Sequence, residues 1–177
     1  MSDKRFISAN VALCFAITLR ILEMAAMRSR KIYFHSLEKA FWLRNRRHLQ
    51  RFIATVFTAE KANLSKLDII FCADDYLLEL NKKFLNHSTY TDVISFNLSD
   101  SAAIVGEIYI SLDRVTENSE LFTTTRSQEL LRVIFHGVLH LTGYSDKTEA
   151  EKKMIRVKED LYLKKYQAFL SRVPRET

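Results

Sequence analysis

The chain contains few residues that interrupt regular structure. Its 177 residues include three glycines and one proline, so long helices and strands are expected. Two cysteines, Cys14 and Cys72, stand far apart, which argues against a disulfide framework or a cysteine-based zinc site and fits a reducing cytoplasm. The apolar run over residues 11–19 falls short of the roughly 20 residues that a membrane helix needs. We therefore expect a cytoplasmic protein that does not span a membrane.

The positive charge is concentrated near the start of the chain. Of the net charge of +6, residues 1–50 hold ten Lys or Arg against three Asp or Glu, whereas the rest holds 17 against 18. The densest basic run lies within residues 44–51. Such a run could attract phosphates, or it could be the solvated face of a helix, and the sequence leaves both interpretations open.

Residues 1–30 differ in pattern from the rest of the chain. Lys4 and Arg5 precede the apolar run, an outline that resembles a weak signal peptide. We prefer to interpret residues 1–30 as an amino-terminal extension, either dispensable or the result of a misassigned start. A single domain over residues 31–171 is expected to follow.

Regular patterning begins at residue 31. Short runs rich in β-branched and aromatic residues indicate strands, and one-sided apolar spacing indicates helices. Asp74 and Ser111 are expected to N-cap the helices at their positions, and Thr148 with Glu151 forms a capping-box pattern. The expected strands are residues 31–35, 66–73, 92–98 and 104–110, the last two as a hairpin. The expected helices are residues 44–57, 74–84, 111–122, 127–141 and 148–170. This order predicts an α+β fold, with a small mixed sheet of about four strands packed with about five helices.

The segment HGVLHLTGYSD, residues 136–146, has the spacing of a metal site. His136 and His140 lie four residues apart on a helix, so their rings share one face and can bind one zinc ion. Gly143 stands where the helix should end and lets the chain turn back, which brings Asp146 to the two histidines. Two His and one carboxylate leave a fourth position for water, as in catalytic rather than structural zinc sites.

A pair of histidines at this spacing also occurs by chance. Here, however, both lie in an otherwise apolar helix, where burying two imidazoles without partners is costly. Gly137 in the middle of the helix costs roughly 1 kcal/mol relative to Ala, which indicates the close approach of another backbone or of a substrate. Zinc peptidases with this spacing carry Glu directly after the first His as the general base. Gly137 occupies that position, which argues against peptidase chemistry.

Three blocks resemble the YbeY family of endoribonucleases. HGVLHLTGY resembles the family signature, YTDVISF (residues 90–96) its PTDVLSF strand, and GEIYIS (residues 106–111) its GDIxIS strand. The resemblance extends over most of residues 31–169. It implies a cytoplasmic, single-strand-specific endoribonuclease with one zinc ion and no small-molecule organic cofactor. It further implies action with the small ribosomal subunit, in maturation of the 16S rRNA 3′ end and in ribosome quality control.

The chain departs from the family pattern at two places. Asp146 stands where the family usually has a third His, and an oxygen ligand is acceptable to zinc. Leu85 replaces an Arg suited to holding phosphate, and Lys82, Lys83 and His87 are candidate substitutes for it. Because of this loss, a non-catalytic ribosome-assembly factor with a structural zinc remains an alternative, as does a metallopeptidase-like zinc hydrolase.

Two acidic residues of the resembling strands are further candidates for a role in catalysis. Asp92 and Glu107 could act as a general base or could hold a metal ligand from behind. Residues of this type more often cap a backbone or face solvent, so the sequence leaves their role open.

Overall fold

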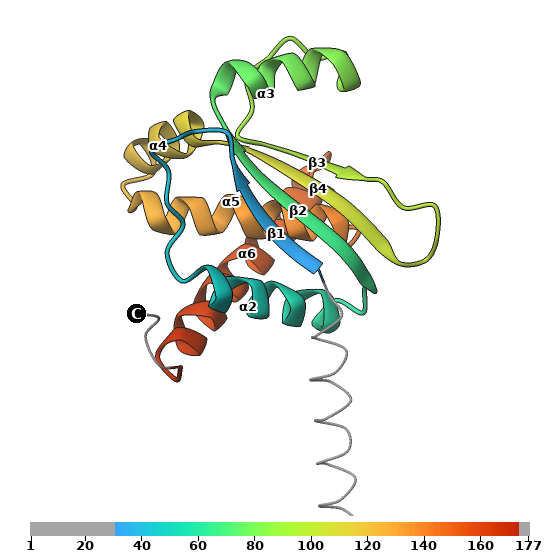
Figure 1. Cartoon of the computed structure of the whole chain (residues 1–177), viewed down its shortest axis with the longest axis vertical. Coiled ribbons are helices and arrows are strands. Elements are labelled where there is room, and N and C mark those ends of the chain that lie inside the picture. Colours follow the sequence, from blue (N-terminus) through green and yellow to red (C-terminus); the bar gives the residue numbers. More distant parts are fainter. Residues whose placement is uncertain (1–30, 174–177) are drawn as a thin grey trace, which may run out of the picture. The chain divides into compact units, whose positions relative to one another are not determined.

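A four-stranded mixed sheet lies at the centre of the protein (Figure 1). Its strand order is β1-β2-β4-β3; β4 pairs in parallel with β2 and antiparallel with β3. The predicted mixed sheet and hairpin are therefore confirmed. The strands are β1 (Lys31–Ser36), β2 (Leu64–Cys72), β3 (Val93–Asn97) and β4 (Ile104–Ser111).

The computed structural model describes residues 31–173. The predicted amino-terminal extension, residues 1–30, lies outside the described residues, and its dispensability stays a prediction. None of the described helices is long and apolar enough to cross a membrane.

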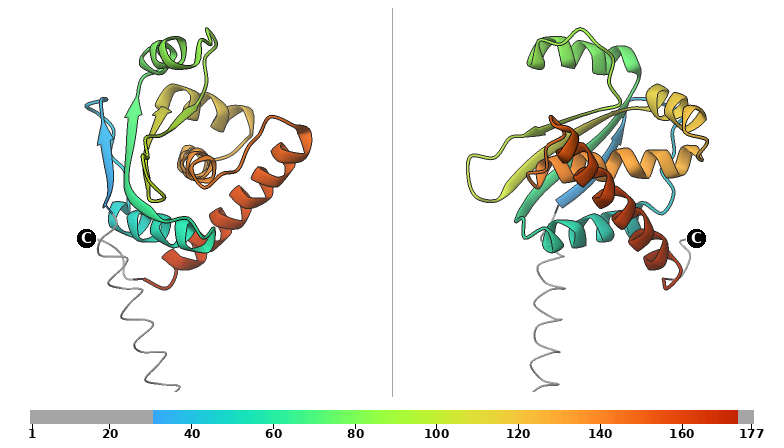
Figure 2. Two further views of the ribbon diagram at one scale, coloured as in Figure 1. Left: turned by 90° about the vertical axis from the view of Figure 1, so that its right-hand side faces the viewer. Right: turned by 180° about the vertical axis from the view of Figure 1, so that it is seen from behind.

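Five α-helices accompany the sheet in the described part of the chain, as expected from the sequence. Helix α5 lies along one face of the sheet, and α6 crosses α5 on the side away from the strands (Figure 2). Helix α3 continues as one π-helical turn, η1 (Asn81–Leu85). The α-helices are α2 (Arg46–Ala59), α3 (Asp74–Leu80), α4 (Leu112–Leu121), α5 (Arg126–Leu141) and α6 (Glu149–Leu170).

The main core lies between the sheet and helices α2, α5 and α6. Alternate residues of a strand point to the same face, so Leu67 and Ile69 of β2 and Ile108 and Ile110 of β4 are buried toward these helices. Aromatic rings then join the three helices, with Phe52 of α2 lying 5.6 Å from the ring of Phe135 in α5. The same cluster includes Tyr162, Tyr166 and Phe169 of α6. Helix α6 is therefore anchored to α5 by packing.

Two of the three predicted helix caps are confirmed. Ser111 accepts a hydrogen bond from the backbone of Arg114, and Thr148 with Glu151 forms the expected capping box. The predicted cap at Asp74 is wrong, because Asp74 is the first residue of α3 and Ala73 precedes it as the N-cap. The Asp74 carboxylate instead accepts hydrogen bonds from Ser111 Oγ and Arg114 Nε, at 3.0 and 2.8 Å. It thus joins α3 to α4.

The basic run within residues 44–51 has two kinds of member. Arg46 donates a hydrogen bond to the carbonyl oxygen of Phe34, and the His48 ring is buried near Phe169. The remaining arginines, Arg44, Arg47 and Arg51, are exposed. The run therefore combines packing residues with a solvated helix face.

Gly137 brings α5 unusually close to the sheet. A Cβ atom at this position would lie 2.7 Å from Cγ2 of Ile108 and 3.1 Å from Oγ of Ser95. The close approach expected from the sequence is confirmed, but the approaching groups are side chains of β3 and β4 rather than a backbone or a substrate. Ser95 Oγ also donates to the Gly137 carbonyl oxygen, at 3.3 Å.

We predict that Gly137→Ala lowers the free energy of unfolding. Alanine gains about 1 kcal/mol of helix propensity, but overpacking a filled core costs roughly 1–3 kcal/mol, and Ile108 is fully buried. Urea unfolding of the wild type and the variant measures the net change in the free energy of unfolding. In an Ile108→Ala background, Gly137→Ala should lower the free energy of unfolding by less, because the contact with the Ile108 side chain is gone. A stabilised Gly137→Ala variant would contradict the close packing.

Candidate metal centre

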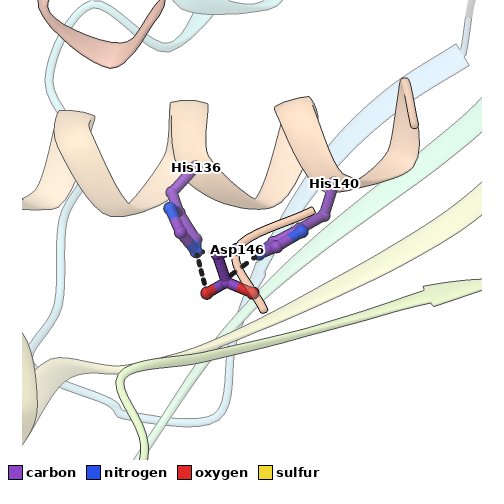
Figure 3. Close-up of side chains that lie close together, drawn as sticks. All are labelled: His136, His140 and Asp146. Carbon is purple, nitrogen blue, oxygen red and sulfur yellow. Dashed lines mark hydrogen bonds and ion pairs between the residues drawn. The ribbon is translucent and has the colours of Figure 1, made fainter. Parts of the chain in front are cut away.

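His136 and His140 project from the same side of α5, one turn apart (Figure 3). Their Nε2 atoms lie 2.8 Å apart. The helix ends at Leu141, and Gly143 follows with φ of 101°, a conformation that glycine adopts without strain. The turn expected at Gly143 is thus present. It brings Oδ2 of Asp146 to 3.9 Å from Nε2 of each histidine.

The three side chains fit one metal ion. Their donor atoms lie within 4.8 Å of one another, and no other such group of three exists among the residues that the structure describes. Tetrahedral ligands at about 2 Å from a zinc ion are roughly 3.3 Å apart, so small side-chain adjustments bring all three onto one ion. Two imidazole nitrogens and one carboxylate oxygen form a donor set that zinc accepts. Which ion binds, and whether these three residues ligate it, stay predictions.

Hydrogen bonds on the far side of each ring orient the histidines. His136 Nδ1 donates to Oε1 of Glu159 at 2.7 Å, and His140 Nδ1 donates to the carbonyl oxygen of Tyr144 at 2.9 Å. Because both acceptors lack a proton to give, each Nδ1 carries a hydrogen, and each neutral ring keeps its lone pair on Nε2. The 2.8 Å between the two Nε2 atoms is a hydrogen-bond distance, so a proton shared between them must leave before both can bind a metal. Both lone pairs therefore point to the place where a metal would bind.

Glu159 is held in place by its own partners. The side chain lies on α6 and is 4% exposed. Its second oxygen accepts from Nη1 of Arg132 at 3.3 Å, and Arg132 also lies 3.5 Å from Glu129. A buried carboxylate is costly unless it is paired, so Arg132 and His136 together explain why Glu159 is tolerated there.

Tyr144 is fixed by a second network. Its hydroxyl donates to Oε2 of Glu60 at 2.8 Å, and Glu60 also accepts from Nζ of Lys158 at 2.8 Å and from the Tyr162 hydroxyl. Burial alone would raise the pKa of Glu60, but these hydrogen bonds outweigh it and lower the pKa. The loop that carries Asp146 is thus tied to α2 and α6.

The two histidines have different proton affinities. Burial lowers the pKa of His136, but the hydrogen bond and charge of Glu159 outweigh burial and raise it above its ordinary value of 6.5. Burial and the neighbouring His136 lower the pKa of His140. A metal binds the neutral imidazole, so protons would compete with a metal more strongly at His136 than at His140.

A cleft of about 770 Å³ opens beside the candidate metal ligands. His136, Asp146 and Glu159 line it, together with Asp92. Burial raises the pKa of the Asp92 carboxyl, which accepts a hydrogen bond from Asn118 Nδ2 at 3.3 Å. The structure therefore brings Asp92 to the site. Glu107 instead faces the opposite side of the sheet from Ile108 and accepts from the Tyr109 hydroxyl.

The candidate phosphate-binding residues lie outside this cleft. Lys82, Lys83 and His87 are exposed, on η1 and the loop after it, and none of them lines the cleft. Lys82 pairs with Glu79 at 3.1 Å. The structure does not bring these residues to the candidate metal ligands, and their binding of phosphate stays a prediction.

Sequence reasoning missed the supporting residue Glu159, although a signal was present. Ile155, Tyr162 and Tyr166 form the buried stripe of α6, and Glu159 falls on that stripe at helical spacing. An acidic residue at a buried position requires a partner. The partner itself, His136, could not be identified from spacing. For Glu60, which follows the end of α2, no comparable pattern in the sequence indicates a role in supporting the site.

We predict that Glu159→Ala weakens zinc binding by about 10- to 100-fold, because groups that orient a ligand histidine contribute that much. Glu159→Gln should lose less, since its amide oxygen still accepts from His136 Nδ1. Competition with a chelating dye at alkaline pH limits the competition from protons at His136, whose pKa is raised.

Asp160→Ala provides the matched control. Asp160 is exposed, adjacent on α6, and also lies within 3.4 Å of Arg132. Equal zinc affinities for Glu159→Ala and Asp160→Ala would show that Glu159 does not position the ligand.

Comparison with known proteins places the chain in a family. The family model for Endoribonuclease YbeY matches residues 34–167. A curated Endoribonuclease YbeY from Cytophaga hutchinsonii is 44% identical over 138 residues, covering 77% of this chain and 96% of that protein. A second, from Flavobacterium psychrophilum, is 44% identical over 124 residues, covering 70% and 89%.

A solved structure agrees with this comparison. The solution structure of TM1509 from Thermotoga maritima matches with a TM-score of 0.51 and 27% identity, covering 77% of this chain and 89% of that one. The resemblance seen in the three sequence blocks is thereby confirmed over most of the described residues, and the chain belongs to the YbeY family of endoribonucleases.

Proposed function

We propose that the protein is a zinc-dependent, single-strand-specific endoribonuclease that acts on ribosomal RNA. The observation that carries the proposal is the convergence of His136, His140 and Asp146 beside an open cleft, in a chain of the YbeY family. The family resemblance supports the finer part of the proposal. This part comprises maturation of the 16S rRNA 3′ end and ribosome quality control in the cytoplasm, with the small ribosomal subunit as partner.

The chain's own residues have distinct tasks in this proposal. His136, His140 and Asp146 would hold the zinc ion, and Glu159 and Tyr144 orient the two rings. Zinc bound there would acidify a water molecule and stabilise negative charge on phosphoryl oxygens.

Asp92 is the best-placed group to accept a proton. Among the acidic residues that line the cleft, Glu159 is bonded to His136 and Glu129 is paired with Arg132, whereas Asp92 accepts from the neutral side chain of Asn118. Burial raises the pKa of Asp92 above its ordinary value, the direction that suits a general base.

The two alternative functions fit the geometry less well. A peptidase of this spacing needs Glu after the first His, but position 137 faces Ile108 and Ser95 of the sheet and has no room even for a Cβ atom. A structural zinc site is normally closed by four protein ligands, whereas this group offers three beside a cleft.

Cleavage assays should separate the three functions. The zinc-loaded protein is expected to cut single-stranded ribosomal precursor RNA, to spare duplex RNA and peptides, and to lose activity with a chelator. His140→Ala should lose most of the bound metal and the activity together. Full metal occupancy in that variant would remove His140 from the ligands, and zinc-loaded protein that cuts no RNA would favour the assembly factor.

The role of Asp146 can be tested separately. Helix α6 is capped by Thr148 rather than by Asp146, so Asp146→Ala should leave helix stability nearly unchanged. Two ligands hold zinc poorly, so we expect Asp146→Ala to lose most of its zinc and Asp146→His to keep it. Metal analysis and melting temperatures of the two variants, both metal-free and zinc-loaded, give the answer. If the Asp146→Ala variant bound zinc as tightly as the wild type, Asp146 would be excluded as a ligand.

A further inference from the structure

We propose that the cleft beside the metal ligands binds the nucleotides next to the scissile phosphate of a single-stranded RNA. In this proposal Lys152 and Arg156 of α6 hold backbone phosphates, and Phe122 stacks on a base. The proposal rests on the proposed function and adds to it the surface that receives the substrate.

The position and size of the cleft fit a nucleotide. His136 and Asp146 form part of its wall, and the rest comes from the end of α4, the following turn, α5, α6 and Asp92 before β3. Its volume of about 770 Å³ lies within the range of sites that take molecules of nucleotide size. A strand lying in the cleft would therefore pass directly beside the metal ligands.

The charges of the cleft are arranged in two levels. Glu129 and Glu159, at 2% and 4% exposure, are buried in its floor and paired with Arg132. Lys152 and Arg156 are exposed, one turn apart on α6, and also line the cleft. Glu129 and Glu159 are thus engaged inside the protein. Asp92 and Asp146 also line the cleft, beside the candidate metal position, and the exposed cations are available to the ligand.

Arg156 is the stronger of the two candidate phosphate ligands. It forms no hydrogen bond or ion pair with the side chains of residues 31–173, whereas Lys152 pairs with the exposed Glu149 at 2.7 Å. A guanidinium group binds two phosphate oxygens at once, and an exposed pair such as Lys152–Glu149 contributes little and separates readily.

Phe122 supplies the aromatic group that single-stranded RNA recognition uses. It follows α4 directly, is 58% exposed and lines the cleft. Thr123 next to it has φ of 52°, and Thr124 adds a hydroxyl to the same wall. An exposed ring beside exposed cations is the combination that binds unpaired nucleotides, by stacking and by charge.

The experiment compares two double variants that remove the same charge from the same helix. Lys152→Ala/Arg156→Ala removes the cations of the cleft. Lys153→Ala/Lys164→Ala removes two exposed lysines of α6 that do not line it. Binding is measured by fluorescence anisotropy of a labelled 2′-O-methyl oligonucleotide, and KM and kcat are measured with RNA of the same sequence. Melting temperature and zinc content verify that both variants are folded.

We expect the cleft variant to bind roughly tenfold more weakly, with a higher KM and a nearly unchanged kcat. The slope of log K against log salt concentration should fall by about 1.4, the value for two single-strand phosphates. The control pair should match the wild type. Phe122→Leu, which keeps apolar bulk but removes the ring, should weaken binding about fivefold or more.

Each other result overturns the proposal. Equal losses in the two double variants, or none in either, would exclude the cleft as the RNA site while leaving the endoribonuclease function intact. An unchanged affinity in Phe122→Leu would remove the stacking contact. Wild-type protein that neither binds nor cuts RNA would overturn the RNA site and the proposed function together.

Discussion

The close packing of α5 on the sheet is the constraint on which the candidate site depends. Gly137 lets the helix approach Ile108 and Ser95 without a side chain between them. His136 and His140 project about a quarter-turn round the helix from that contact, toward Asp146. A bulkier residue at position 137 would lift the helix and displace both rings. The same contact explains why the general base of a zinc peptidase has no place here.

Local features of the site could be predicted from the sequence, whereas its supports could not. The spacing of His136 and His140, the turn at Gly143 and the capping box at Thr148 are encoded by residues close together in the chain. The contact between His136 and Glu159 depends on how α6 crosses α5, which no local spacing specifies. The N-cap predicted at Asp74 is wrong for a similar reason. The Asp74 carboxylate accepts hydrogen bonds from Ser111 and Arg114 at the start of another helix, and no local pattern predicts that contact.

The electrostatics of the site link metal binding to folding. A buried carboxylate such as Glu159, and a partly buried one such as Asp92, oppose folding unless positive charge lies near them. In the folded chain Arg132 meets Glu159, and the charge of Asp92 interacts with His136. A bound cation would add positive charge to this acidic neighbourhood, so it should stabilise the packing of α6 on α5 as well as serve the chemistry.

The residues that support the site extend beyond those that would ligate the metal. His136, His140 and Asp146 lie within eleven consecutive residues, but Glu159, Lys158 and Tyr162 follow later in the chain, on α6. During synthesis the three candidate ligands therefore leave the ribosome before the helix that orients them. Until α6 has emerged and packed, His136 has no Glu159 and the Tyr144 loop lacks its anchor. A nascent chain should thus remain unable to assemble the candidate metal centre until α6 is complete.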